Sequence, residues 1–68
     1  MILTINGKEE TVDGSDLTVT ELLQAKAISM PDMVSVQLNG KILKRDTFDT
    51  AFVRANDHVN FLYFMGGG

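Results

Sequence analysis

The chain has 68 residues, a formal net charge of −3, 44% hydrophobic residues and 22% charged residues. This size fits one small domain with a single core, and the low charge content argues against an intrinsically disordered chain. With no cysteine and one histidine, the sequence excludes disulfides, cysteine zinc sites, iron–sulfur clusters, thiol nucleophiles and a histidine metal cluster. Its acidity argues against non-specific nucleic-acid binding. The short apolar runs and the absence of an export signal predict a cytoplasmic protein without a membrane segment.

The first residues predict a β-hairpin. Residues 1–5 and 8–12 are β-prone, and Asn6-Gly7 between them tolerates the positive φ angles of a tight turn. The second strand is rich in charge, which is typical of a strand at the edge of a sheet. Residues 13–16 are expected to form a loop.

A helix is predicted after this loop, over residues 19–27. Thr18 and Glu21 have the spacing of a capping box, in which each side chain bonds a backbone N–H at the helix start. Leu17 and Leu22 have the spacing of a hydrophobic staple. The next proline in the chain prevents the helix from continuing.

The middle of the chain predicts a second hairpin. Residues 34–38 alternate between apolar and polar side chains, Asn39-Gly40 marks a tight turn, and residues 41–43 begin the return strand. Residues 45–56 are expected to be irregular, with a short helical turn near 48–52.

Residues 59–65 form the most β-prone stretch and are predicted to be the last strand. The resulting order is strand, strand, helix, strand, short strand and strand. One helix over a mixed four- or five-stranded sheet, with the first and last strands parallel at its centre, is the β-grasp arrangement. The predicted fold class is therefore α+β, with one main helix packed on one face.

The last strand is apolar on both faces. Alternation directs the odd-numbered residues 59–63 toward the helix, which leaves Leu62 and Phe64 on the uncovered face. A strand of this kind in a one-helix domain requires a second cover. We interpret the cover as a partner protein, with Met65 at the same interface. The alternative is a loop of this chain, such as residues 45–56.

Three glycines, Gly66, Gly67 and Gly68, are predicted to form a flexible tail beyond a β-grasp domain of residues 1–65. Glycine adds no buried side chain and loses the most conformational entropy on ordering, so folding does not explain the tail. Gly66 and Gly67 suit threading into a narrow tunnel, which would bring the Gly68 carboxylate to another protein's active site. Activating a carboxylate as an acyl-adenylate needs Mg²⁺ and phosphate-binding groups. This sequence has no phosphate-binding loop, so the chain is expected to be a substrate, with no catalytic residue, metal or bound cofactor of its own.

Motifs along essentially the whole chain carry a family resemblance. In chain order they are Ile5-Asn6-Gly7, Leu17-Thr18-Val19 with Glu21-Leu22-Leu23, Val36-Gln37-Leu38-Asn39-Gly40 through Arg45, Asp57-His58-Val59, and the terminal glycines. In their order and spacing they resemble the ThiS/MoaD-type ubiquitin-like sulfur carriers, most closely the ThiS branch of thiamine thiazole synthesis. Two departures are a third glycine, Gly66, and Asn56 where family members often have glycine.

The resemblance implies a specific activity. In this family a ThiF-type, E1-like enzyme uses ATP and Mg²⁺ to adenylate the terminal glycine carboxylate. Sulfur from a sulfide or persulfide source, such as a sulfur donor protein, then displaces AMP and leaves a C-terminal thiocarboxylate. A ThiG-type thiazole synthase accepts the sulfur. Carried over to this sequence, Gly68 is the modified residue, and Gly67 is the flexible residue behind it.

Other functions remain open at this point. The chain could be a MoaD-like carrier for molybdopterin or another pathway, a ubiquitin-like modifier that forms isopeptides, or a binding module that uses the Leu62 and Phe64 face. His58 is interpreted as a residue at the entry of a strand. Lys44 and Arg45 are interpreted as solvated surface.

Overall fold

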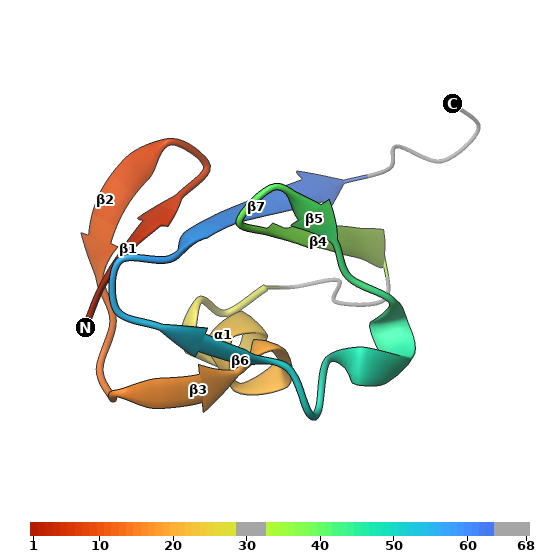
Figure 1. Cartoon of the computed structure of the whole chain (residues 1–68), viewed down its shortest axis with the longest axis horizontal. Helices are drawn as coiled ribbons and strands as arrows, with labels where there is room; N and C mark the ends of the chain where they lie inside the picture. The colour runs from red at the N-terminus through yellow and green to blue at the C-terminus, as the bar shows by residue number, and fades with distance from the viewer. Residues whose placement is uncertain (29–32, 64–68) are drawn as a thin grey trace.

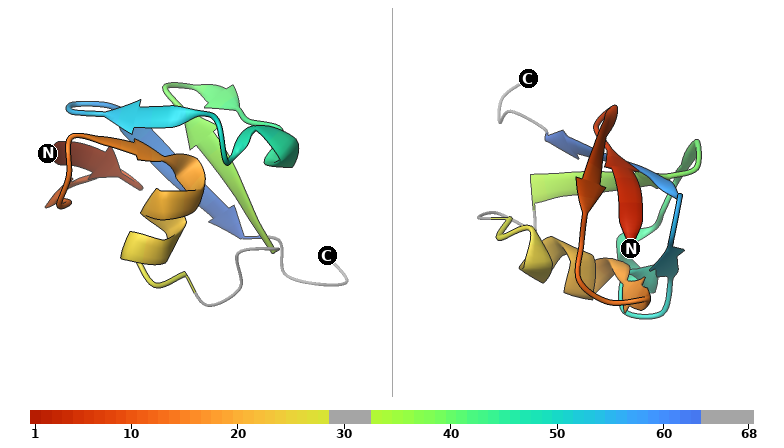
Figure 2. Two further views of the ribbon diagram at one scale, coloured as in Figure 1. Left: turned by 90° about the horizontal axis from the view of Figure 1, so that it is seen from below. Right: turned by 90° about the vertical axis from the view of Figure 1, so that its left-hand side faces the viewer.

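A computed structural model describes residues 1–28 and 33–63 of the chain, without the side chain of Tyr63. Five strands form a mixed sheet in the order β2-β1-β7-β4-β5, and the helix α1 (Val19–Ala25) lies against one face (Figures 1 and 2). The strands of this sheet are β1 (Ile2–Ile5), β2 (Lys8–Thr11), β4 (Val34–Leu38), β5 (Lys41–Ile42) and β7 (His58–Tyr63). Two further strands, β3 (Asp16–Thr18) and β6 (Phe52–Arg54), form a separate antiparallel pair.

The first and last strands lie side by side and parallel, as the sequence predicts. β1 pairs with β7 at Thr4↔His58 and Ile5↔Val59, and β2 is an edge strand. On its other side β7 pairs with β4 in antiparallel register along the whole length of β4. This topology confirms the β-grasp arrangement and places the central strand β7 last in the chain.

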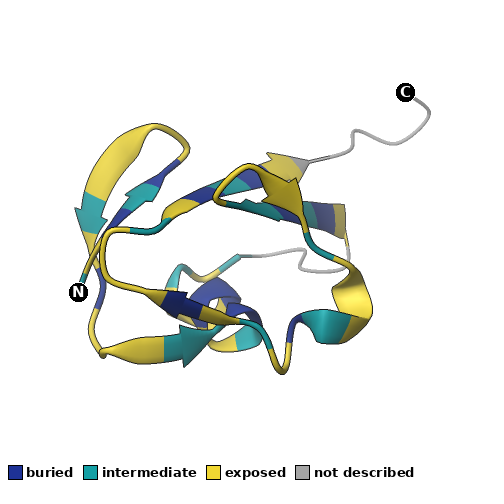
Figure 3. Cartoon of the chain, in the orientation of Figure 1, coloured by how far each residue is buried: buried dark blue, intermediate teal, exposed yellow. Residues whose placement is uncertain are grey.

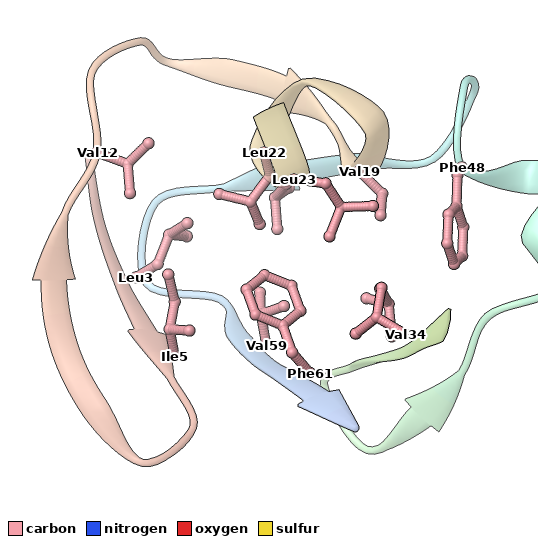
Figure 4. Packing of buried hydrophobic residues seen from close by; sticks show 12 residues of the cluster. Leu3, Ile5, Val12, Val19, Leu22, Leu23, Val34, Phe48, Val59 and Phe61 are labelled. Atoms are coloured by element: carbon pink, nitrogen blue, oxygen red, sulfur yellow. The ribbon is translucent and has the colours of Figure 1, made fainter. Parts of the chain in front are cut away.

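The core lies between α1 and the sheet (Figure 4). Alternation along the strands determines which side chains enter it: Val59 and Phe61 of β7 are buried, whereas Leu62 is exposed. The helix contributes an apolar stripe at helical spacing. The buried residues are Leu3, Ile5, Val12, Val19, Leu22, Leu23, Val34, Val36, Phe48, Val53, Val59 and Phe61.

The start of α1 confirms the predicted capping box. The Glu21 amide donates to Thr18 Oγ1 at 3.1 Å, and the Thr18 amide donates to Glu21 Oε1 at 2.9 Å. These two bonds satisfy backbone donors that have no partner within the helix. Leu17 packs against the same core cluster that contains Leu22, as expected for a hydrophobic staple.

The end of α1 comes earlier than predicted. The helix ends at Ala25, not at Ala27, because Ala27 adopts a positive φ of 53°. The Ala27 amide donates to the Gln24 carbonyl at 3.0 Å, and the Ile28 amide donates to the Leu23 carbonyl at 3.1 Å. This is the bonding pattern of a Schellman motif, with alanine in the left-handed position that glycine usually occupies. No glycine marks this end of the helix, which is why the sequence did not reveal it.

Ala27→Gly is expected to stabilise the domain. Glycine adopts a positive φ without the steric cost that a Cβ imposes. That relief outweighs the greater entropy of glycine in the unfolded chain, so the free energy of unfolding should rise by about 0.5 kcal/mol. Urea denaturation followed by circular dichroism measures the change. Ala25→Gly, at the last residue of the helix, is the matched control and should instead destabilise by about 0.5–1 kcal/mol, because Ala25 has helical backbone angles. Destabilisation by both variants would contradict the assigned end of the helix.

The region between β5 and β7 differs from the expectation of an irregular segment. The helical turn is a 3₁₀ helix at Arg45–Thr47 rather than a turn at 48–52, and Phe52 begins the strand β6. β6 pairs with β3, whose first residue, Asp16, falls within the loop that the sequence predicts. Each of these strands has only three residues, and their pairing depends on contacts between distant parts of the sequence. The alternation of apolar and polar side chains over three residues is too short to predict a strand.

Candidate functional site

The residues proposed for function are Leu62 and the five residues that follow Tyr63 in the sequence. Leu62 lies in β7, on the face of the sheet opposite α1, and is 42% exposed. The other proposed residues, Phe64, Met65, Gly66, Gly67 and Gly68, lie outside the described residues. The structure therefore positions the strand that leads to the tail, and it describes the sheet face beside that strand.

The exposure of Leu62 tests one of the two covers considered from the sequence, the loop of this chain. Within residues 1–28 and 33–63, no loop buries this side chain. The loop alternative is wrong for Leu62, because residues 45–56 pack elsewhere: Phe48 enters the core, and Phe52 belongs to the β3–β6 pair. Leu62 thus remains available to a partner.

A second exposed side chain, Ile42 of β5, belongs to the same face. It pairs with Gln37, and Gln37 pairs with Asn60, so the three residues form one row across β5, β4 and β7. Ile42 is 60% exposed, and Figure 3 colours β5 as exposed. Sequence reasoning missed Ile42, although the register of the Asn39-Gly40 hairpin could have placed it there.

The centre of this face is neutral. Asn60 Nδ2 donates to Gln37 Oε1 at 2.9 Å, and Ser35 pairs with Leu62 in the adjoining row. The side chains between Leu62 and Ile42 are therefore uncharged. Depletion of charge around exposed apolar residues is typical of the centre of a protein–protein interface. We refer to Ser35, Gln37, Ile42, Asn60 and Leu62 as the open face.

Two asparagine-glycine turns hold β7 in place from both sides. Asn39, at the β4–β5 turn, accepts a hydrogen bond from the His58 amide at 2.9 Å through Oδ1. Asn6, at the β1–β2 turn, accepts one from the Phe61 amide at 2.8 Å in the same way. Both asparagines have φ near 50°, which this residue type tolerates better than most. The turns that set the two hairpins thereby also bond to the strand that leads to the tail.

The residues before β7 form a compact turn. Asn56 has a φ of 72°, in the left-handed region that asparagine tolerates better than most residues. The Asp57 carboxylate accepts a hydrogen bond from the Arg54 amide at 2.9 Å and one from Asn39 Nδ2 at 3.1 Å. His58 is exposed at the first position of β7, which confirms its interpretation as a strand-entry residue.

The side chain of Arg45 makes specific contacts with β4 and with Phe48. One guanidinium nitrogen donates to the Val34 carbonyl at 2.8 Å, and the guanidinium carbon lies 5.5 Å from the centre of the Phe48 ring. The strand β5 has only two residues and leaves the start of β4 without a strand partner on that side. The Arg45 side chain forms its hydrogen bond with β4 there. Arg45 is exposed, as its interpretation as surface predicts, and these two contacts hold its side chain against β4 and Phe48.

Residues 1–28 and 33–63 contain no group of three histidine, aspartate or glutamate side chains placed to bind a metal ion. Among the described elements, no helix has the length and hydrophobicity needed to cross a bilayer.

Comparison with known proteins agrees with the fold and with the motifs. The model of the ThiS family matches residues 2–68. The crystal structure of the thiamine biosynthesis protein ThiS from Geobacter metallireducens is 54% identical, with a TM-score of 0.91 and 100% of both chains covered. A solution NMR structure of a thiamine biosynthesis protein from the same organism is also 54% identical, with a TM-score of 0.82, covering 100% of this chain and 88% of that one. No match was found among curated proteins. The extent of these matches shows that the chain belongs to the ThiS family.

Proposed function

We propose that this chain is a cytoplasmic sulfur carrier that delivers sulfur for thiamine thiazole synthesis. A ThiF-type enzyme would transfer AMP from ATP to the Gly68 carboxylate and release pyrophosphate. Hydrosulfide would then attack the acyl carbon and displace AMP, which leaves a thiocarboxylate at Gly68. A ThiG-type thiazole synthase would accept this sulfur. In this scheme the chain is a protein co-substrate, and the ATP and Mg²⁺ belong to the adenylating enzyme.

One observation carries this proposal: the family match extends from residue 2 to residue 68 and so includes the glycines. The relative from G. metallireducens with which the chain shares 54% identity is described as a thiamine biosynthesis protein. These two findings favour the thiamine pathway over the molybdopterin alternative. They also favour a carrier over an isopeptide-forming modifier.

The fold supports a role for the C-terminal end as well. β7 is the central strand, between β1 and β4, and the backbone of Tyr63 at its end pairs with Val34 of β4. Five residues follow Tyr63, and a fully extended chain of that length reaches about 17 Å. A partner that binds the Gly68 carboxylate must therefore approach within this distance of the open face.

Intact mass spectrometry tests the proposed chemistry. The purified chain is incubated with a ThiF-type enzyme, ATP, Mg²⁺ and sulfide. Its mass should increase by the difference between one sulfur atom and one oxygen atom, with the change located at Gly68. Omission of ATP is the control and should leave the mass unchanged. An unchanged mass with ATP, under conditions that convert a known carrier, would reject the proposal.

A partner-binding module is the second candidate, because Leu62 and Ile42 are exposed on one face. This function needs the open face but not the tail. A truncated chain ending at Met65 separates the two candidates. Full partner binding by the truncated chain, together with no sulfur transfer by the complete chain, would favour the binding module.

A further inference from the structure

The two strands that pair with β7 do so over different lengths. β4 pairs with β7 as far as Tyr63, whereas the pairing with β1 stops at Ile5↔Val59. In Figure 1, β7 continues beyond the end of β1. The edge of β7 that faces β1 therefore extends past its partner strand.

Asn6 completes one additional position of this parallel ladder. Its amide donates to the Val59 carbonyl at 2.9 Å, and its Oδ1 accepts from the Phe61 amide at 2.8 Å. A residue in a parallel strand makes the same two bonds with its own N–H and C=O groups. The asparagine side chain thus replaces a backbone carbonyl at the point where the chain turns away into β2.

The next position of the ladder has no occupant among the described residues. By alternation, the Phe61 carbonyl and the Tyr63 amide face the side of β1, while Leu62 bonds toward β4. No described group forms a hydrogen bond with either of them. An edge with an unpaired carbonyl and amide is a template for another strand. Gly7, the next residue after Asn6, has no side chain that could cover this edge. The space that a Cβ would occupy there has no atom within 4 Å.

We propose that an extended segment of the adenylating enzyme pairs with this edge, parallel to β7, with one residue opposite Leu62. The N–H of that residue would bond to the Phe61 carbonyl, and its carbonyl would accept from the Tyr63 amide. One residue would thereby satisfy both groups, as Asn6 does one position earlier. This inference rests on the proposed function, which supplies the partner.

The chemistry of the docking segment follows from the register. Residues that pair across a ladder project to the same face, so the docking residue lies beside Leu62 on the open face. Leu62 is 42% exposed and has uncharged neighbours. An apolar or β-branched side chain fits this position. Main-chain bonds would provide affinity, and the contact with Leu62 would provide specificity.

The five residues beyond Tyr63 connect this edge to the reaction. They reach about 17 Å when extended, so an enzyme that holds the Gly68 carboxylate also has surface close to the Tyr63 amide. Pairing at this edge would align the tail with the enzyme's active site. It would also restrict the tail before adenylation, which lowers the entropic cost of positioning the carboxylate.

A backbone ester between Leu62 and Tyr63, in a chemically synthesised chain, tests the proposal. The ester removes the Tyr63 N–H and retains the side chain, and because it also weakens the Leu62 carbonyl as an acceptor toward β4, urea denaturation of the ester chain is measured beside its Kd. We expect the Kd for the ThiF-type enzyme to increase about three- to tenfold, the effect of one lost hydrogen bond. Circular dichroism should show an unchanged fold. An unchanged Kd would contradict the proposal.

Hydrogen exchange of the unmodified chain provides a second measurement. The Tyr63 amide should exchange rapidly in the free chain and at least about tenfold more slowly in the complex with the enzyme. The Phe61 amide, bonded to Asn6, is the internal control and should be protected in both states. Protection already present in the free chain, or induced only by a ThiG-type synthase, would contradict the proposal.

The two proposals fail in different ways. Conversion of Gly68 to a thiocarboxylate without protection of the Tyr63 amide would reject docking at this edge and leave the carrier function supported. Protection of the amide without conversion would support docking and reject the carrier function.

Discussion

Deletion of Gly68 should abolish conversion to the thiocarboxylate and leave the stability of the domain unchanged. The same result is expected when one alanine is added after Gly68. Either change moves the terminal carboxylate by about 3.5 Å along the chain, whereas adenylation requires the reacting atoms to be positioned within a fraction of that distance. Glycine contributes no side chain to the core, so the loss should be confined to the reaction.

Intact mass after incubation with the adenylating enzyme, ATP and sulfide measures conversion of each variant beside the unmodified chain. Thermal unfolding by circular dichroism is the control for folding, and the melting temperatures should agree. Conversion of the deleted chain at the normal rate would show that the reactive carboxylate is not that of Gly68. A lower melting temperature would show that the tail contributes to the fold.

Leu22→Ala should destabilise the domain strongly. Leu22 is fully buried on α1 and packs in the cluster between the helix and the sheet (Figure 4). Removing its side chain leaves a cavity that the surrounding strands cannot fill, and the expected loss is about 3 kcal/mol. A domain of this size has a total stability of only about 3–5 kcal/mol, so a substantial fraction of the variant should be unfolded at 37 °C. Urea denaturation followed by circular dichroism measures the effect.

Leu62→Ala is the matched control, because it makes the same substitution at an exposed site of the same domain. Its free energy of unfolding should change by less than about 0.5 kcal/mol. Its Kd for the adenylating enzyme should instead increase by about tenfold, since truncation of a central interface side chain commonly costs more than 1 kcal/mol. Equal destabilisation by Leu22→Ala and Leu62→Ala would contradict the assignment of the two faces. Unchanged binding would remove Leu62 from the partner surface.

Most of the sheet and the start of the helix could be predicted from the sequence, because their signals are local. Asn6-Gly7 and Asn39-Gly40 determine tight turns through their tolerance of positive φ, and they fix the register of both hairpins. Thr18 and Glu21 mark the start of α1 through bonds made within one turn. The alternation of β7 separates buried Phe61 from exposed Leu62, and so reveals one of the two exposed apolar side chains of the open face.

Other features depend on contacts between distant residues. The β3–β6 pair joins Leu17 to Val53, and neither three-residue strand carries enough alternation to be recognised alone. The end of α1 depends on Ala27 adopting the conformation that glycine usually supplies.

The sequence by itself determined the turns, the capping box, the β-grasp order and the resemblance that the family match confirms. Only the tertiary structure decided that Ile42 shares the open face with Leu62 and that Asn6 ends the ladder at Phe61. The physical reason is the range of the interactions. Backbone preferences and the alternation of apolar and polar side chains act over a few neighbouring residues, so they can be recognised in the sequence. An unpaired strand edge exists only once strands 50 or more residues apart have met, as Asn6 and Phe61 do.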